Sequence, residues 1–148
     1  MSNYNSLNAL IQAITEAAES ALQTEVFETI KETMLSHIAS DVYGAYPKPK
    51  MYDRRGSEGG FSDPANIENV GSGLTLEMIN KTPPNPEGNP EPTTDKNLAE
   101  VIETGVGYDY FSPGARPYVE NTIEDLKSSG AHVDAFKQGM LRQGFKIE

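Results

Sequence analysis

The chain has 148 residues, of which 12 are basic and 22 are acidic, so its net charge is −10, and it contains neither cysteine nor tryptophan. This length favours a single domain over residues 1–148, and the lack of cysteine excludes disulfides, thiolate metal sites and a cysteine nucleophile. No run of 18 apolar residues occurs and no basic start precedes an apolar stretch, so we expect neither a membrane span nor a signal peptide.

Residues 1–44 are predicted to form one long helix. Neither glycine nor proline occurs before Gly44, and apolar side chains recur every three to four residues. Ser6 or Asn5 is suited to cap the start, and Gly44 to end the helix in a left-handed conformation. A straight helix of about 38 residues would be about 57 Å long, which exceeds the width of such a domain. We therefore expect a break, a bend or a projection, with Thr24–Glu25 as the candidate break.

Residues 45–60 are predicted to be an extended basic arm, because Pro47 and Pro49 favour extended backbone before them. Residues 47–62 carry four basic and two acidic side chains, whereas residues 1–46 carry six acidic side chains and one lysine. This opposition of charge favours head-to-tail contact between copies of the chain over contact of the arm with nucleic-acid phosphates. The residues expected to reach a neighbouring subunit are Tyr43, Tyr46, Lys48, Lys50, Tyr52, Arg54 and Arg55.

A β-hairpin is predicted over residues 61–81, where the apolar spacing changes to two. Ile67 and Val70 precede Gly71-Ser72-Gly73, and apolar and polar residues then alternate from Leu74 to Asn80. The glycines between the two runs indicate the turn.

Residues 82–95 form a Pro-rich loop, since five prolines among residues 83–92 exclude a helix or a central strand. We expect this loop to be a second contact surface that becomes ordered on assembly. Residues 96–148 are predicted to hold the shorter helices and a terminal strand. Their expected limits are a cap at Thr94 or Asp95, a stop at Gly105, a start at Pro117, a stop near Gly130, a stop at Gly144 and a strand at Phe145–Ile147.

Together these elements predict an α+β fold with a long N-terminal helix, a small antiparallel β-sheet of three to four strands, and two or three shorter helices packed on it. Catalytic and metal-binding patterns are thin, so we expect no enzyme and no cofactor. His37 and His132 are more typical of surface or helix-end histidines than of metal ligands. Glu100 and Glu103 lie three residues apart, which favours a solvated helix edge over an acid–base pair.

Three segments stand out in chain order: VYGAYPKPKMYDRR, LAEVIETGVG, and ARPYVENTIEDLKSSG followed by FKQGMLRQGF. In this order, over roughly residues 35–147, they resemble the tail-completion (head–tail joining) minor structural proteins of tailed phages. The motifs that match are Ile102-Glu103-Thr104-Gly105 and Arg116-Pro117-Tyr118. By itself, Arg116-Pro117-Tyr118 is typical of a helix start with a buried tyrosine, where Arg116 would pair with Glu103.

The resemblance implies a virion protein of the neck or tail, assembled in the host cytoplasm into a ring of identical copies around the DNA channel. Its implied partners are the head connector and tail-tube or tail-terminator proteins, with DNA passing through unbound and no membrane involved. An acidic channel wall would repel the phosphates of the passing DNA. Two rival interpretations are an acidic regulatory binding module, such as a nucleic-acid mimic acting on a basic partner, and a small hydrolase that uses Glu103.

Overall fold

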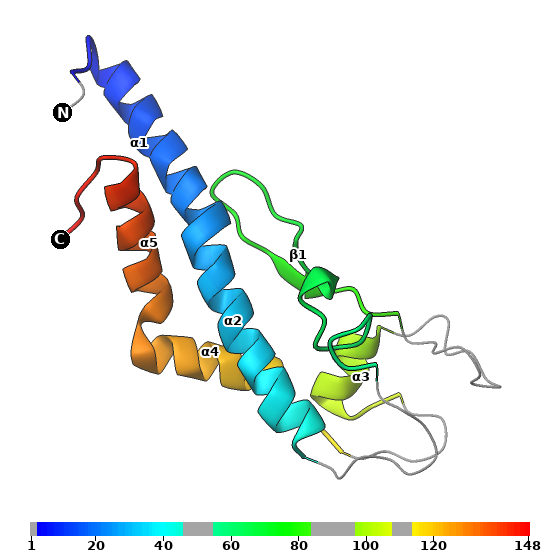
Figure 1. The fold of residues 1–148 in the computed structure, drawn as a ribbon. Coiled ribbons are helices and arrows are strands. Elements are labelled where there is room, and N and C mark those ends of the chain that lie inside the picture. The colour runs from blue at the N-terminus through cyan, green and yellow to red at the C-terminus, as the bar shows by residue number, and fades with distance from the viewer. Residues whose placement is uncertain (1–2, 46–54, 84–96, 108–113) are drawn as a thin grey trace.

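A computed structural model describes residues 3–45, 55–83, 97–107 and 114–148, and its dominant element is the predicted long helix (Figure 1). The helix consists of α1 (Leu7–Ala21), a π-helical turn (Leu22–Val26), α2 (Phe27–His37) and a second π-helical turn (Ile38–Tyr43). Ser6 caps the start, since its hydroxyl accepts a hydrogen bond from the Ala9 amide at 3.1 Å.

The break predicted at Thr24–Glu25 is a π-helical turn through which the helix continues. The buried positions of the helix step by four from Ala17 to Ala21, by five to Val26, by eight to Met34, and then by four to Ile38 and Val42. Steps of four or five exceed the 3.6 residues of an α-helical turn, so an α-helix alone would carry the buried face steadily around the axis. The wider π-helical turns take up the excess residues and keep the face on the core.

Gly44 ends the helix, but not in the predicted left-handed conformation. Its φ of −73° is right-handed, and its amide donates to the Ala39 carbonyl at 2.9 Å. A Cβ at this position would lie 2.5 Å from the Ser40 carbonyl oxygen. The helix end therefore requires glycine for close backbone approach rather than for a positive φ.

The predicted hairpin is confirmed as an antiparallel pair, β1 (Ile67–Asn69) and β2 (Met78–Asn80), in which Glu68 faces Ile79. The strand expected from Leu74 onward begins only at Met78, because residues before it are held in a turn and by the long helix. The side-chain amide of Gln23 donates to the carbonyls of Gly73 and Thr75 at 3.0 and 3.1 Å. A short 3-10 turn, Pro64–Asn66, leads into β1.

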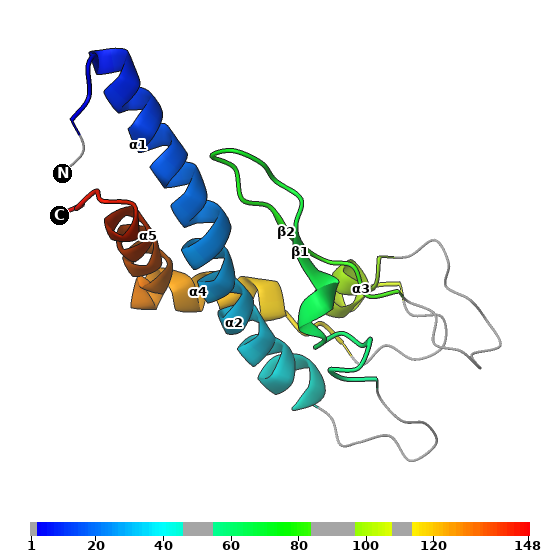
Figure 2. The same ribbon diagram turned by 45° about the horizontal axis from the view of Figure 1, so that its top comes forward.

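Three shorter helices complete the part of the fold that the structure describes: α3 (Leu98–Thr104), α4 (Tyr118–Ser129) and α5 (Ala131–Arg142). Helices α4 and α5 pack on the long helix, with α4 against α2 and α5 against α1, as Figures 1 and 2 show. The predicted stops at Gly105 and Gly130 are confirmed, since both glycines adopt left-handed backbone angles. The caps predicted at Thr94 or Asp95 lie outside the described residues, and Asn97 caps α3.

Two apolar clusters hold these elements together. The larger one joins the second half of the long helix to the hairpin, α3 and the start of α4 through Ile38, Phe61, Ile67, Ile102 and Tyr118, with Met34 and Val42 beside them. The smaller one joins α1 to α5 through Ala17, Ala21 and Met140, with Phe136 and Phe145 against it.

The fold class α+β is confirmed, although the part of the chain that the structure describes contains two strands rather than three to four. The terminal strand predicted at Phe145–Ile147 is wrong. The Phe145 amide donates to the Met140 carbonyl at 2.9 Å, and its ring stacks on Tyr4, so this segment wraps the end of α5. Among the described helices, none has both the length and the apolar content that a membrane span requires.

Candidate functional site

Most of the predicted basic arm lies outside the described residues, namely Tyr46, Lys48, Lys50, Tyr52 and Arg54. Its two described members contact their own chain. The Tyr43 hydroxyl accepts a hydrogen bond from the Phe61 amide at 3.2 Å. The Arg55 guanidinium donates to the carbonyls of Gly59 at 3.2 Å and Pro83 at 2.8 Å. Contact of the arm with a neighbouring subunit stays a prediction.

The two short motifs meet at one place, which we call the Glu103 junction (Glu103, Gly105, Arg116, Pro117 and Tyr118). The Glu103 carboxylate lies at the start of α4, where Oε2 accepts the Val119 amide at 2.8 Å and Oε1 accepts the Glu120 amide at 3.0 Å. The first amides of a helix have no partner within the helix and carry partial positive charge. Glu103 therefore caps α4 from a helix 16 residues earlier in the chain.

Gly105 makes the close approach at the junction possible. It ends α3 with a φ of +71°, and its amide donates to the Val101 carbonyl at 2.9 Å. A Cβ here would collide with the backbone of Ala115 and would lie 2.5 Å from the Gly114 carbonyl carbon. The chain passing over it is fixed by the Arg116 amide, which donates to the Ile102 carbonyl at 2.9 Å.

Helix α4 begins at Tyr118, one residue after the start that the sequence predicts at Pro117. Pro117 stands one position before the first helical residue, and its carbonyl accepts the Asn121 amide at 3.0 Å. Tyr118 is 2% exposed and meets the ring of Phe61 edge-on, with 5.1 Å between the centroids. Burial, followed by the nearby charge of Glu103, raises the pKa of Tyr118 well above its ordinary value. Its role at the junction is to anchor the start of α4 in the larger core.

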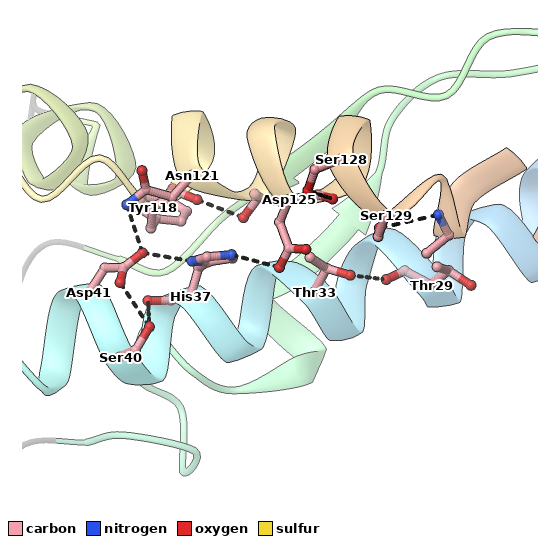
Figure 3. Close-up of polar contacts among 12 residues, drawn as sticks. Thr29, Thr33, His37, Ser40, Asp41, Tyr118, Asn121, Asp125, Ser128 and Ser129 are labelled. Atoms are coloured by element: carbon pink, nitrogen blue, oxygen red, sulfur yellow. Dashed lines mark hydrogen bonds and ion pairs between the residues drawn. The ribbon is translucent and has the colours of Figure 1, made fainter.

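A second polar group, which no motif in the sequence marks, joins the long helix to α4. We call it the His37 cluster (His37, Asp41, Asn121 and Asp125), and Figure 3 shows its bonds. His37 Nδ1 lies 2.8 Å from Asp41 Oδ2, and Nε2 lies 3.1 Å from Asp125 Oδ2. The Asn121 amide donates to the same Asp41 oxygen at 3.0 Å. In the sequence, His37 and Asp41 are four residues apart, and so are Asn121 and Asp125. This spacing places each pair on one side of its helix, but it does not indicate that the two helices pack together.

The protonated form of His37 fits this geometry, because an imidazolium ring can donate to both carboxylates at once. Burial by itself would lower the pKa of His37, but hydrogen bonds and charge attraction from Asp41 and Asp125 outweigh it and raise that pKa above 6.5. Burial would raise the pKa of Asp41, but bonds from Asn121, Ser40 and His37 prevail and lower it below 3.8. The cluster is a charged clamp between two helices.

The acidic side of the long helix is partly neutralised inside the subunit. Arg142 at the end of α5 forms an ion pair with Glu25, and it also donates to the Ser20 hydroxyl at 3.2 Å. The Arg142 hydrogen bond lowers the pKa of Glu25. Among the described residues, no group of three or more histidine and acidic side chains, the His37 cluster included, could hold a metal ion.

Comparison with known proteins identifies the family. The YomN family model matches residues 6–142. A protein of Bacillus subtilis (strain 168), described as the SPbeta prophage-derived uncharacterized protein YomN, is 32% identical over 146 residues, which cover 95% of this chain and 90% of that protein. No solved structure matches the chain. The chain belongs to the YomN family.

Proposed function

We propose that this member of the YomN family is a structural virion protein of a tailed phage. In this proposal, copies form a ring in the neck or at the head-proximal end of the tail, around the DNA channel. The prophage origin of the Bacillus subtilis relative supports the phage association. The resemblance of the two short motifs to tail-completion proteins supports the finer assignment to the neck or tail.

The observation that carries the proposal is the Glu103 junction. The motif residues Glu103, Gly105 and Tyr118 are a helix cap, a close-approach turn and a core anchor, each occupied by contacts within the fold. Both oxygens of Glu103 accept backbone amides. Motif residues whose side chains and backbone are used to fix the fold suit a structural component of an assembly. Such a role does not require the motif residues to bind a substrate.

Charge supports the same assignment. The first 46 residues carry a net charge of −5 while residues 47–62 carry +2, so an acidic helix on one copy can attract a basic segment on the next. The overall charge of −10 also suits a wall past which DNA slides, because like charge prevents phosphates from adhering.

The proposal is tested in the phage or prophage that encodes the chain. We expect mass spectrometry of purified particles to find the chain in a fixed copy number per virion. Deletion of its gene should leave separate filled heads and tails in electron micrographs, and supplying the wild-type chain in trans should restore joined particles. Normal infectious particles without the chain would overturn the proposal. A chain absent from particles but bound tightly to a basic host protein would instead support the regulatory alternative.

A further inference from the structure

The outer edge of β2 carries backbone groups that have no hydrogen-bond partner. The Glu77 carbonyl accepts the Val70 amide at 2.8 Å, so Glu77 directs its backbone groups toward the strand of β1. Because bonding positions alternate along an antiparallel pair, Leu76, Met78 and Asn80 direct theirs away from β1. Within the described residues, none of these outward amides and carbonyls forms a hydrogen bond. An open edge of this kind can accept a further strand.

The two faces of the hairpin differ in chemistry. Ile67 and Asn80 are buried and Met78 packs on the larger apolar cluster, so these positions face the core. The alternate positions Glu77 and Ile79 are exposed. Within the part of the chain that the structure describes, the Glu77 carboxylate forms neither an ion pair nor a hydrogen bond. Figures 1 and 2 both show the hairpin on the side of the long helix away from α5.

The predicted basic arm has the sequence of a strand that pairs along one edge only. Pro47 and Pro49 stand at alternate positions, so in an extended backbone both lack an N–H on the same edge. Lys48, Lys50 and Tyr52 would direct their N–H and C=O groups to the opposite edge. Proline and lysine are typical of an outermost strand, because they prevent further strands from adding.

Side-chain chemistry selects a parallel arrangement of the arm beside β2. An antiparallel arrangement would place Lys50 on the core face beside Met78, where its charge would be buried. In a parallel pair the bonding positions of one strand lie beside the non-bonding positions of the other, so Lys50 lies on the exposed face beside Glu77. In the same register Tyr52 lies beside Ile79. The exposed face then holds one ion pair and one apolar pair.

An arm in this register belongs to another copy of the chain, because a chain's own arm cannot reach. Gln23 of the long helix donates to the Thr75 carbonyl at 3.1 Å. The helix ends at Gly44, 21 residues and about 30 Å farther along. Lys48 would lie beside Thr75, but the four residues from Gly44 to Lys48 extend over about 14 Å at most.

We propose that the outer edge of β2 receives the basic arm of a neighbouring copy as an added parallel strand, with Lys50 beside Glu77. The inference rests on the proposed function in that copies meet head to tail, and it names the surface that the arm contacts. Glu19 of the acidic helix borders this hairpin, since its Oε1 lies 3.5 Å from the place of a Cβ on Gly73. An arm on the edge of the next copy is a head-to-tail contact, which can close into a ring.

Disulfide trapping between two single-cysteine variants tests the contact. Because the chain has no cysteine, Lys50→Cys and Glu77→Cys each carry one thiol. In an equimolar mixture under mild oxidation, we expect the mixed disulfide to form about tenfold faster than either variant links to itself. Met51→Cys is the matched control, since it lies next in the chain but on the opposite face of the added strand. Its mixture with Glu77→Cys should link about tenfold more slowly.

Proline substitutions give an independent readout by light scattering over a range of concentrations. We expect a wild-type mass that exceeds one chain and rises with concentration. Lys50→Pro removes an N–H from the pairing edge, so it should weaken assembly more than Lys50→Ala, which loses the charge alone. Met51→Pro removes an N–H from the other edge and should assemble as the wild type does. Hydrogen exchange at the Met78 amide should slow on assembly, because that amide would then have an acceptor.

Three results would each overturn the inference. They are a wild-type chain that stays monomeric at every concentration, a Glu77→Cys variant that links to itself as fast as to Lys50→Cys, and a Lys50→Pro variant that assembles as well as Lys50→Ala. Virion content does not enter these measurements. A chain that pairs in this way but is absent from particles would therefore contradict only the proposed function.

Discussion

Replacing Glu103 by alanine tests whether the junction is a helix cap. The substitution removes an ionised acceptor from two backbone amides, at 2.8 and 3.0 Å, and leaves the start of α4 without those bonds. Loss of a helix cap costs about 0.5–2 kcal/mol, and hydrogen bonds to charged groups are worth about 1.5–3 kcal/mol. Since one of the two bonds is part-buried and the other exposed, we expect a loss of about 2 kcal/mol in the free energy of unfolding.

The assay is urea and thermal unfolding at neutral pH, followed by circular dichroism. For a chain of this length, about 2 kcal/mol lowers Tm by about 4–8 °C. Glu100→Ala is the matched control, because Glu100 is exposed on the same helix and makes no side-chain hydrogen bond with the described residues. Hydrogen exchange should quicken at the Val119 and Glu120 amides in Glu103→Ala and stay unchanged in the control.

Glu103→Gln separates the cap from the rival catalytic role. Glutamine keeps one acceptor oxygen but loses the charge that favours the positive end of α4, so about 1 kcal/mol should be lost. The capping argument is refuted if Glu103→Ala and Glu100→Ala unfold alike. It also fails if Glu103→Gln leaves stability and assembly intact while it abolishes a hydrolytic activity.

Three further predictions concern the other contacts. The raised pKa of His37 adds stability below pH 6.5 that is lost as pH rises through the folded value. In urea titrations at pH 5.5 and 8.5, the unfolding free energy of the wild type should therefore fall more between the two pH values than that of His37→Gln. Gly139→Ala should lower the free energy of unfolding by about 1–3 kcal/mol in the same assay, because the new Cβ would lie 2.5 Å from the Cβ of Ala21. Alanine by itself favours a helix over glycine, so a variant as stable as the wild type or more stable would refute this close approach. Gly105→Ala should cost more than 1 kcal/mol, since it combines a positive φ with a backbone collision, and a Tm within 1 °C of wild type would contradict that geometry.

The sequence predicts the parts of this fold that depend on neighbouring residues. Helix starts and stops such as Ser6, Gly105 and Gly130 follow from capping and left-handed glycine, which are local properties. The His37 cluster could not be predicted, because Asp125 lies 88 residues from His37 and only the packing of α4 on the long helix brings them together. The strand predicted at Phe145–Ile147 is wrong for a similar reason. The ring of Phe145 packs against the apolar cluster of α1 and α5, a tertiary contact that the local sequence does not indicate.

The sequence singles out the residues of the Glu103 junction but not the bonds that they form. The motifs around Glu103 and Tyr118 were identified from short sequence resemblances, yet nothing in their spacing indicates that a carboxylate on one helix caps the next. That arrangement depends on tertiary contacts that bring the start of α4 beside the end of α3, such as the bond from the Arg116 amide to the Ile102 carbonyl.

The π-helical turn at Leu22–Val26 holds one residue more than regular α-helix needs to connect α1 and α2 in the same orientation. Deleting one residue inside this turn should therefore restore regular α-helix and leave Leu7 and Ile14 on the side on which α5 lies. Deleting one residue within α1 has no such excess to remove, and because each residue of an α-helix adds about 100° of rotation, it would swing everything before the deletion by about 100°. The same loss of one codon is thus absorbed in the π-helical turn and disruptive in the helix before it.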